Sequence, residues 1–428
     1  MMYYYIESYG CSANQNNSEI AEAKLISAGF SKTNIPEQAD IIIINTCIVK
    51  TKTEQKMLSR IEKFKNKKLI VMGCMPNLFA KKIKAIAPKA GLIGTNDIDK
   101  IVYAIRKIFE NKEAIYLSNT KKCKASMFKN RKEKIIGITQ ISEGCLGNCT
   151  YCITKLVKGK LYSYNPEEIL KSIKRDLVSG CKEIWLTSQD NAAYGKDIGI
   201  NLVYLLKQII KLPWDFKLRI GMMNPNNVLE FLDDLLEVYE DEKIYKFIHL
   251  PLQSGSNKIL VDMKRQYKVE DFIKIIEKFR KKFPLISIST DVIVGYPTET
   301  EEDFNETFEL IAKIKPDFLN ISRYGKREGT EAAKLKMLDA REVMKRTKKL
   351  MILHKRIALE KNIALKDKIC NVLVNSKKRG DFLARDENYR LFVIKTKQKL
   401  DLIGKNVAVL ARSIYPHYVI AEFVQEFL

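Results

Sequence analysis

Residues 143–152 read EGCLGNCTYC and contain three cysteines, Cys145, Cys149 and Cys152, at C-x3-C-x2-C spacing. An apolar run at residues 135–141 predicts a β-strand, so the cysteines lie on the loop that follows it. Four-cysteine zinc sites need two C-x2-C pairs or partner histidines, and none lies nearby. Ligation by thiolates alone indicates an iron–sulfur cluster, with a structural zinc site or three unrelated cysteines as the alternatives. Three ligands to a four-iron cluster leave one iron open, and an open iron allows catalysis.

The composition is that of a globular protein of the cytoplasm. The 428 residues are enough for two or three domains. The hydrophobic content of 46% is ordinary for a soluble chain, and no apolar run reaches the length of a membrane span. The first nine residues lack the pattern of a secretory signal. Nine cysteines without export fit a reducing compartment, where thiols act as metal ligands.

The chain is strongly basic, and its charge is unevenly spread. The net charge is +24, and residues 341–400 hold 18 Lys or Arg against 6 Asp or Glu, which accounts for half of that excess. Basic segments of this kind form either a solvated helix face or a phosphate-binding surface. Although a Lys-, Ile- and Asn-rich composition inflates the lysine count, we expect a nucleic acid as the partner.

The first 115 residues predict a doubly wound α/β domain. Strand-like and helix-like segments alternate there, and the run at residues 40–46 is continuously apolar, which is typical of a strand buried in a parallel sheet. Alternation of this kind indicates an open parallel sheet with helices on both faces. The expected strands are residues 3–9, 40–46, 69–72 and 92–93, and the expected helices are residues 18–28, 53–64, 81–86 and 97–109.

A second group of cysteines follows the strands of this domain. Cys11, Cys47 and Cys74 each come at the carboxyl end of an expected strand. These ends form the binding crevice of an open parallel sheet, so we expect the three thiols to converge although they are distant in sequence. Lone cysteines after strands are often only small buried residues. Three of them at equivalent places favour a second cluster with three protein ligands.

The central part of the chain predicts a partial barrel of six strand–helix units. Residues 116–134 lack periodicity and are expected to form a linker, in which Cys123 is a free thiol. Polar and glycine-rich segments follow the strands beyond it, and strand ends carry the chemistry of barrel enzymes. The expected strands are residues 135–142, 183–187, 217–221, 245–250, 287–294 and 318–322, and the expected helices are residues 166–179, 201–211, 227–239, 269–283 and 301–313.

The chain ends in a basic helix followed by a β-rich segment. Residues 331–365 predict a long basic helix, and short apolar runs follow at residues 369–374, 391–396, 406–411 and 417–423. Short strands separated by turns predict a small barrel. Arg385, Tyr389 and Arg390 could meet RNA by charge and stacking, with ordinary surface polarity as the alternative.

These motifs resemble those of the radical S-adenosylmethionine methylthiotransferases over essentially the whole chain. The loop with Cys145, Cys149 and Cys152 is similar to the cluster loop of that family. Cys152–Lys155 and Gly221–Pro225 are most similar to the archaeal and eukaryotic branch, which acts on N6-threonylcarbamoyladenosine in tRNA. Further segments that carry the resemblance are Gly10–Asn14, Asn45–Cys47, Gly73-Cys74, Ser188–Gly195, His249–Ser256 and Asp291–Thr298.

Two segments depart from the family pattern. The usual Arg-Gly after the cluster loop is Lys158-Gly159 in this chain. The usual Pro-Arg-Pro-Gly-Thr is replaced by Lys326-Arg327-Glu328-Gly329-Thr330. Both changes concern the expected substrate mouth, and both leave the cluster cysteines untouched.

The resemblance implies an architecture, cofactors and site residues. Residues 1–115 would hold an auxiliary cluster, residues 116–134 would be a linker, residues 135–365 a radical S-adenosylmethionine domain, and residues 366–428 an RNA-binding barrel of the TRAM type. Two [4Fe-4S] clusters are implied, one on each cysteine triad, together with S-adenosylmethionine. The implied contacts to S-adenosylmethionine are Tyr151, Gln189, Asp190 and Ser254, and those to RNA are Lys155, Lys158, Arg385, Tyr389 and Arg390.

The resemblance also implies a reaction. Sulfur and a methyl group would be inserted at C2 of N6-threonylcarbamoyladenosine near the tRNA anticodon, with no catalytic residue beyond the cluster ligands. An electron donor such as ferredoxin or flavodoxin and a sulfur donor are implied as partners, in the cytoplasm and without a membrane. The alternatives are methylthiolation of isopentenyl-adenosine in tRNA or of a ribosomal-protein aspartate. A non-enzymatic RNA-binding iron–sulfur sensor is an alternative of a different class.

Overall fold

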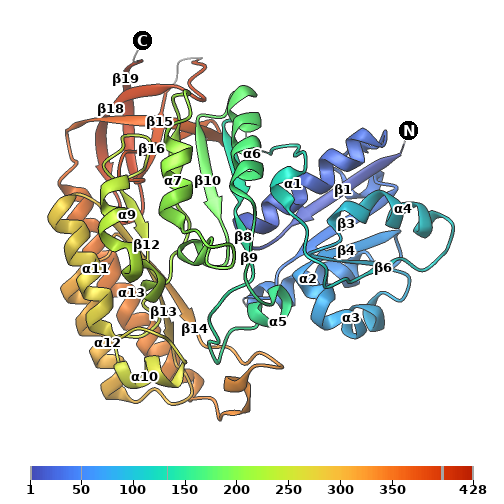
Figure 1. Ribbon diagram of the computed structural model, residues 1–428, viewed down its shortest axis with the longest axis horizontal. Coiled ribbons are helices and arrows are strands. Elements are labelled where there is room, and N and C mark those ends of the chain that lie inside the picture. The colour runs from blue at the N-terminus through green and yellow to red at the C-terminus, as the bar shows by residue number, and fades with distance from the viewer. Residues whose placement is uncertain (1, 50, 133, 397–399, 427–428) are drawn as a thin grey trace. The chain divides into compact units, whose positions relative to one another are not determined.

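The computed structural model describes residues 2–49, 51–132, 134–396 and 400–426 (Figure 1). The chain forms two compact units. The N-terminal unit comprises residues 1–132, 138–145 and 152–172, and the C-terminal unit comprises residues 133–137, 146–151 and 173–428. From residue 133 to residue 173 the chain alternates between the two units, and the boundaries at residues 115, 134 and 365 remain predictions. None of the described helices has the length and apolar character needed to cross a membrane.

A six-stranded parallel sheet forms the centre of the N-terminal unit, which confirms the doubly wound prediction. The strand order is β2-β1-β3-β4-β5-β6, and each strand pairs in parallel with its neighbours. The sequence does not predict the two short edge strands, β2 and β6. The strands are β1 (Tyr3–Ser8), β2 (Ser31–Lys32), β3 (Ile41–Thr46), β4 (Leu69–Gly73), β5 (Gly91–Gly94) and β6 (Ile115–Tyr116).

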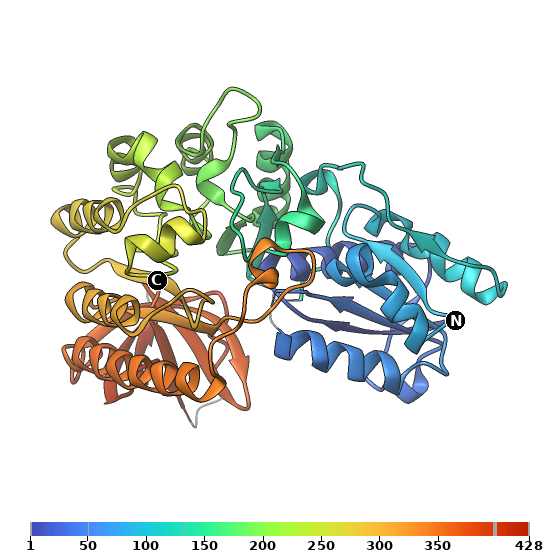
Figure 2. The same cartoon turned by 90° about the horizontal axis from the view of Figure 1, so that it is seen from below.

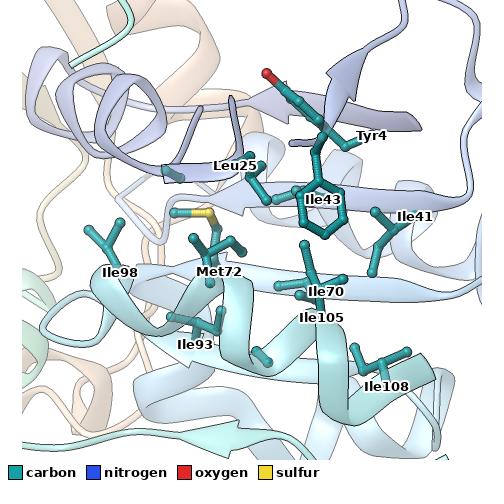
Figure 3. Close-up of a cluster of buried hydrophobic side chains, with 14 of the residues drawn as sticks. Tyr4, Leu25, Ile41, Ile43, Ile70, Met72, Ile93, Ile98, Ile105 and Ile108 are labelled. Carbon is teal, nitrogen blue, oxygen red and sulfur yellow. The ribbon is translucent and has the colours of Figure 1, made fainter. Parts of the chain in front are cut away.

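Helices cover both faces of this sheet (Figure 2). Side chains alternate between the faces of a strand, so Ile41 and Ile43 pack with helices α1 and α4 (Figure 3). Ile42 and Ile44 pack with α2 and α3 on the other face. All four isoleucines are fully buried, which explains why β3 is continuously apolar. The helices are α1 (Ser12–Ser27), α2 (Thr51–Lys63), α3 (Cys74–Ile86) and α4 (Ile101–Phe109).

The predicted barrel strands follow one another along the chain, and all of them except residues 138–140 of the first strand belong to the C-terminal unit. The chain enters β7 beside β10, where the amide of Glu183 donates to the carbonyl oxygen of Ile135 over 3.0 Å. β10 pairs with β11, and an isolated β-bridge joins Leu218 of β11 to Ile244, which lies shortly before β12. β12, β13 and β14 form a separate parallel sheet. These strands are β7 (Ile136–Gln140), β10 (Glu183–Thr187), β11 (Lys217–Arg219), β12 (Phe247–His249), β13 (Ser287–Val294) and β14 (Phe318–Arg323).

The helices between these strands lie close to their predicted positions. The exception is the helix predicted at residues 227–239, which is split into α8 (Pro225–Val228), a 3-10 turn and α9 (Leu232–Val238). Pro225 begins α8 because its fixed φ suits the first turn of a helix. The other predicted helices are α6 (Pro166–Val178), α7 (Leu202–Ile210), α11 (Val269–Lys282) and α12 (Glu301–Ile314), whereas the sequence does not predict α10 (Asn257–Asp262).

A closed five-stranded barrel ends the chain and confirms the β-rich prediction. Its order is β15-β16-β17-β19-β18, and helix α13 (Ala340–Ile363) lies beside it (Figure 2). This helix begins later than residue 331, because the Asp339 carboxylate caps it by accepting from the amides of Arg341 (2.8 Å) and Glu342 (3.2 Å). The strands are β15 (Ile369–Lys378), β16 (Asp381–Asp386), β17 (Leu391–Lys395), β18 (Asn406–Ile414) and β19 (Val419–Glu426).

His354 of α13 makes the fold sensitive to acid. Its ring is buried and stacks on that of His417, with ring centroids 5.9 Å apart. Burial, helped by the charge of His417, lowers the pKa of His354 from 6.5 to about 4. Between these values only the unfolded chain binds the proton, so stability is lost as the pH falls through this window, by up to roughly 3 kcal/mol.

We therefore expect His354→Gln to lose less stability than the wild type between pH 7 and pH 4.5. Glutamine keeps a side-chain donor for the carbonyl oxygen of Asp317, which lies 3.3 Å from His354 Nε2. Urea unfolding of both apo-proteins at the two pH values measures the difference. Equal losses in the two proteins would show that His354 does not titrate in this way.

Candidate functional site

The three N-terminal cysteines lie at one edge of the six-stranded sheet. Cys11 directly precedes α1, Cys47 directly follows β3, and Cys74 is the first residue of α3. The strands that lead to them, β1, β3 and β4, are neighbours in the sheet. The three cysteines therefore lie where the carboxyl ends of neighbouring parallel strands meet, and the cluster expected on them remains a prediction.

Close backbone packing sets Cys47 against the turn that carries Cys11. A Cβ atom at Gly10 would lie 2.7 Å from the Cβ of Cys47 and 3.0 Å from its Sγ. Gly10 also has a φ of +107°, a conformation that only glycine adopts without strain. A residue with a side chain at this position would push the two cysteines apart.

Asn14 ties the turns of the three cysteines to one another. Its Nδ2 donates to the carbonyl oxygens of Tyr9 (2.7 Å) and Thr46 (2.8 Å), the residues that precede the Cys11 and Cys47 turns. Its Oδ1 lies 3.8 Å from the Sγ of Cys74. The side chain is buried, and one amide therefore fixes three segments that are distant in sequence.

Two lysines and one glutamate form a buried charge trio beside these cysteines. The Nζ atoms of Lys124 and Lys158 lie 2.5 Å and 2.6 Å from the same Oε1 atom of Glu143, and at most 4% of each side chain is exposed. Two cations thus share one anion. Burial raises the pKa of Cys74 to about 12, and the positive charge of Lys158 opposes this shift. A metal would replace the thiol proton, and the trio would then face a thiolate.

The three charged residues of the trio come from segments for which the sequence predicts other roles. Helix α5 (Thr154–Lys158) packs on α3, and Ile153 and Val157 enter the core that contains Cys47 and Cys74. Lys158, a predicted RNA contact, is buried by this packing. Lys124 comes from the predicted linker. The one signal for the trio in the sequence is an acid, Glu143, directly after an apolar strand.

The first half of the C-x3-C-x2-C loop is held by backbone contacts within the N-terminal unit. A Cβ atom at Gly144 would lie 1.9 Å from the carbonyl oxygen of Lys160, so this position requires glycine. The amide of Cys145 donates to the carbonyl oxygen of Gly159 over 3.2 Å. Lys155, also a predicted RNA contact, donates through its Nζ to the carbonyl oxygen of Cys145.

Residues 146–151 of the loop belong to the C-terminal unit. The Thr150 amide donates to the carbonyl oxygen of Met263 over 3.2 Å, and the Thr150 Oγ1 lies 2.8 Å from the Tyr296 hydroxyl. Tyr151, a predicted contact to S-adenosylmethionine, packs against the small core that contains Tyr296. Cys149 therefore sits on a segment fixed by α10 and by the end of β13.

Among the other predicted contacts to S-adenosylmethionine, Asp190 is buried and accepts four hydrogen bonds from the protein. Its carboxylate accepts from the amides of Ala192 (3.1 Å) and Asn224 (2.9 Å) and from the Nδ2 atoms of Asn224 (2.8 Å) and Asn227 (2.7 Å). Asp190 thus orients the loops after β10 and β11. Gln189 beside it is partly exposed.

Ser254 is buried beneath the surface of the strand ends. It is 1% exposed, and its Oγ accepts from the amide of Ser256 over 3.2 Å and lies 3.4 Å from the Thr307 Oγ1. These contacts lock the loop after β12 onto helix α12. A direct contact between the Ser254 side chain and a ligand would need this loop to open.

A row of polar side chains crosses β12, β13 and β14. The His249 Nε2 lies 2.9 Å from the Asp291 Oδ2, and the Asp291 Oδ1 accepts from the Asn320 Nδ2 over 2.8 Å. His249 is partly exposed, with 16% of its side chain accessible, so it is not an enclosed core histidine. The row offers hydrogen-bonding groups on adjacent parallel strands.

The predicted RNA contacts of the barrel have internal partners. Tyr389 is 6% exposed, and its ring lies 4.9 Å from that of Tyr245 and 5.0 Å from that of Phe247. The Arg385 Nη1 donates to the carbonyl oxygen of Tyr389 over 2.9 Å, and Arg390 lies 3.9 Å from Asp386. These residues join the barrel to β12, so base stacking on Tyr389 is incompatible with this packing.

Both triads consist of thiols alone, which is the donor type that iron–sulfur clusters use. None of these six cysteines forms a disulfide. In the described part of the chain, no three His, Cys, Asp or Glu side chains gather as they would around a single metal ion. Ligands of a four-iron cluster bind separate irons, so their sulfur atoms lie further apart than those of ligands that share one ion. Sulfur-only ligation is the usual choice for such clusters.

Comparison with known families identifies the class. The radical SAM superfamily model matches residues 139–311, and the uncharacterized protein family UPF0004 matches residues 3–94. The fold is similar to that of the radical S-adenosylmethionine methyltransferase TsrM from Kitasatospora setae (TM-score 0.56, 10% identity, 78% of this chain and 77% of that one). The protein is therefore a radical S-adenosylmethionine enzyme, a class that uses S-adenosylmethionine and a [4Fe-4S] cluster.

More similar relatives identify the family. A Pyrococcus horikoshii protein named probable threonylcarbamoyladenosine tRNA methylthiotransferase is 40% identical over 93% of this chain and 95% of its own. An Archaeoglobus fulgidus protein of that name is 39% identical over 98% of both chains. The Drosophila melanogaster threonylcarbamoyladenosine tRNA methylthiotransferase is 38% identical over 81% of this chain and 64% of its own. The chain belongs to the threonylcarbamoyladenosine tRNA methylthiotransferase family.

Proposed function

We propose that the protein inserts sulfur and a methyl group at C2 of N6-threonylcarbamoyladenosine near the tRNA anticodon. The observation that carries this proposal is the 40% identity, over nearly the full length of both chains, to archaeal proteins that bear the name of this activity. The resemblance of Cys152–Lys155 and Gly221–Pro225 to the same branch supports it.

The two cysteine triads would hold two [4Fe-4S] clusters with separate tasks. Cys145, Cys149 and Cys152 would hold the cluster that supplies radical chemistry with S-adenosylmethionine. Cys11, Cys47 and Cys74 would hold the auxiliary cluster that supplies sulfur. The protein itself fixes the thiols through Gly10, Asn14 and the loop contacts, and it excludes water from the two buried thiols, Cys47 and Cys74.

The same proposal names partners and a location. Radical chemistry of this class needs an electron, which we assign to a donor such as ferredoxin or flavodoxin, and the inserted sulfur needs a donor of its own. Because the proposed substrate is tRNA, we expect the enzyme in the cytoplasm. The strongly basic composition of residues 341–400 supports a polyanionic substrate.

Nucleoside analysis of tRNA tests the activity. The chain is expressed in a host that makes N6-threonylcarbamoyladenosine but lacks its own methylthiotransferase, and its tRNA is digested and analysed by mass spectrometry. We expect the methylthiolated nucleoside to form with the wild type and not with Cys145→Ala. Methylthiolated isopentenyl-adenosine would favour the first alternative, and a modified ribosomal aspartate the second. An unchanged nucleoside profile with intact clusters would favour a sensor.

The salt dependence of tRNA affinity tests the role of the barrel. Lys377, Lys378 and Arg379 are exposed at the turn between β15 and β16. Each phosphate neutralised contributes roughly −0.7 to −0.9 to the log–log slope of affinity against salt. Replacing all three by glutamine is therefore expected to make the slope shallower by about 2 to 3. Binding is measured at several salt concentrations.

A charge-matched variant serves as the control in this experiment. Lys274, Lys281 and Lys313 are exposed on α11 and α12, so their replacement by glutamine removes the same charge from another surface. Deleting the barrel is a less informative test. Tyr389 of the barrel packs on Tyr245 and Phe247, so the deletion would expose these two rings as well as remove charge. Equal slopes for both triple variants would leave the barrel turn without a specific role in binding RNA.

A further inference from the structure

An arginine that the sequence does not single out contacts one of the candidate cluster ligands. The Arg265 Nη1 lies 3.1 Å from the Sγ of Cys149, and both residues belong to the C-terminal unit. The Arg265 Nε donates to the Tyr267 hydroxyl over 3.3 Å. That hydroxyl lies 2.8 Å from the carbonyl oxygen of Pro251, which anchors it to the loop after β12. The guanidinium is thus held at the sulfur and cannot swing away freely.

A second anchor orients the other end of the guanidinium. The Arg265 Nη2 donates to the Oδ1 of Asn224. The Asn224 Nδ2 donates to the Asp190 Oδ2 over 2.8 Å, and the Asn224 amide donates to the Asp190 Oδ1 over 2.9 Å. The Asp190 carboxylate can only accept hydrogen bonds, so the Asn224 Nδ2 must point toward Asp190 and the Asn224 Oδ1 toward Arg265. A continuous chain therefore runs from Asp190 through Asn224 and Arg265 to Cys149.

The charge of Arg265 has no carboxylate partner in this chain of contacts. Within the described residues, no ion pair includes Arg265, and its side chain is partly buried. A partly buried cation without a counter-charge is costly, and the group it faces most directly is a thiol that becomes a thiolate on metal binding. Cluster formation at Cys149 would supply the missing negative charge.

We propose that Arg265 is a positioning residue that holds the Cys149 sulfur and makes the cluster on Cys145, Cys149 and Cys152 easier to reduce. A hydrogen bond from a cation stabilises the more negative, reduced form of a cluster more than the oxidised form. The inference rests on the proposed cluster at this loop and not on the identity of the tRNA substrate, so it can fail or succeed independently of the nucleoside analysis.

Potentiometric titration followed by electron paramagnetic resonance tests the proposal on the full-length, reconstituted protein. The relevant cluster is the one whose signal changes shape when S-adenosylmethionine is added. For Arg265→Gln we expect its reduction equilibrium to shift at least tenfold toward the oxidised form, which is about 59 mV for one electron. Arg265→Lys keeps the charge but not the fork of donors, so we expect an intermediate shift.

A charge-matched control variant and a binding assay for S-adenosylmethionine complete the experiment. Lys264→Gln removes an equal charge from the adjacent residue, whose Nζ pairs with Glu331 at 2.6 Å, and is expected to leave the potential unchanged. Binding of S-adenosylmethionine is measured by equilibrium dialysis. An unchanged potential together with a tenfold loss of this affinity would overturn the proposal, because Arg265 would then contact the ligand and not Cys149. If Arg265→Gln fails to assemble the cluster, Arg265→Lys decides, and a wild-type potential there overturns the proposal.

Discussion

Replacing Cys11, Cys47 and Cys74 together by alanine is expected to abolish the methylthiolated product while deoxyadenosine is still released from S-adenosylmethionine. Asn14 joins the turns that carry the three residues at the edge of the N-terminal sheet, whereas contacts of Thr150 within the other unit hold the segment of Cys149. Because different segments hold the two groups of cysteines, we expect the loss of one cluster to leave the activity of the other intact. Anaerobically reconstituted wild type should contain about eight irons, and the triple variant about four.

The remaining cysteines provide a matched control for this prediction. Cys123, Cys181 and Cys370 form no disulfide and lie outside both triads. Their joint replacement by alanine is expected to keep about eight irons and full product formation. Full iron content in the N-terminal variant would show that the second cluster does not exist. Loss of deoxyadenosine and product together, in a protein shown to be folded, would contradict the division of tasks.

The regular elements of this fold follow from local sequence, but the ends that build the site do not. β10 and β13 have their predicted bounds, because each strand is followed by a segment rich in glycine and polar residues. α1 begins at Ser12, six residues before its predicted start, and its first turn is polar. That turn contains Asn14, which is buried to hold the cysteine turns, so its polarity reflects the site and not solvent exposure.

Other features that local sequence does not reveal depend on contacts between distant segments. Burial alternates along β16, but its sequence, Asp-Phe-Leu-Ala-Arg-Asp, does not alternate in polarity and directly follows Gly380, so its pattern resembles a turn. Tyr389 among charged residues predicts an RNA contact, yet its ring is buried against β12. Lys124 lies in a segment without periodicity, and only tertiary packing reveals its buried partner Glu143. Sequence patterns report local structure, and none of these contacts is local.

Glu143→Gln is expected to destabilise the protein by about 3 to 5 kcal/mol, because it leaves two buried lysine side chains without their shared anion. Lys124 and Lys158 both lie within 2.6 Å of the Glu143 Oε1. Urea unfolding of the apo-protein measures the loss. Glu62→Gln is the matched control, since Glu62 pairs with Lys65 at 2.6 Å but both side chains are about half exposed, and such pairs contribute less than about 1 kcal/mol. Losses of equal size would show that the trio contributes no more than a surface pair.

An apolar version of the trio separates stability from support of the metal site. Replacing Lys124 and Lys158 by methionine and Glu143 by leucine removes all three buried charges, and such exchanges are often neutral or stabilising. We therefore expect the apo-protein of this variant to unfold at a urea concentration at least as high as that of the wild type. The trio has one cation in excess beside Cys74, which is the charge that a thiolate-bound cluster requires. The apolar variant should consequently retain less iron at the N-terminal triad than the wild type, and full retention would show that the trio serves folding alone.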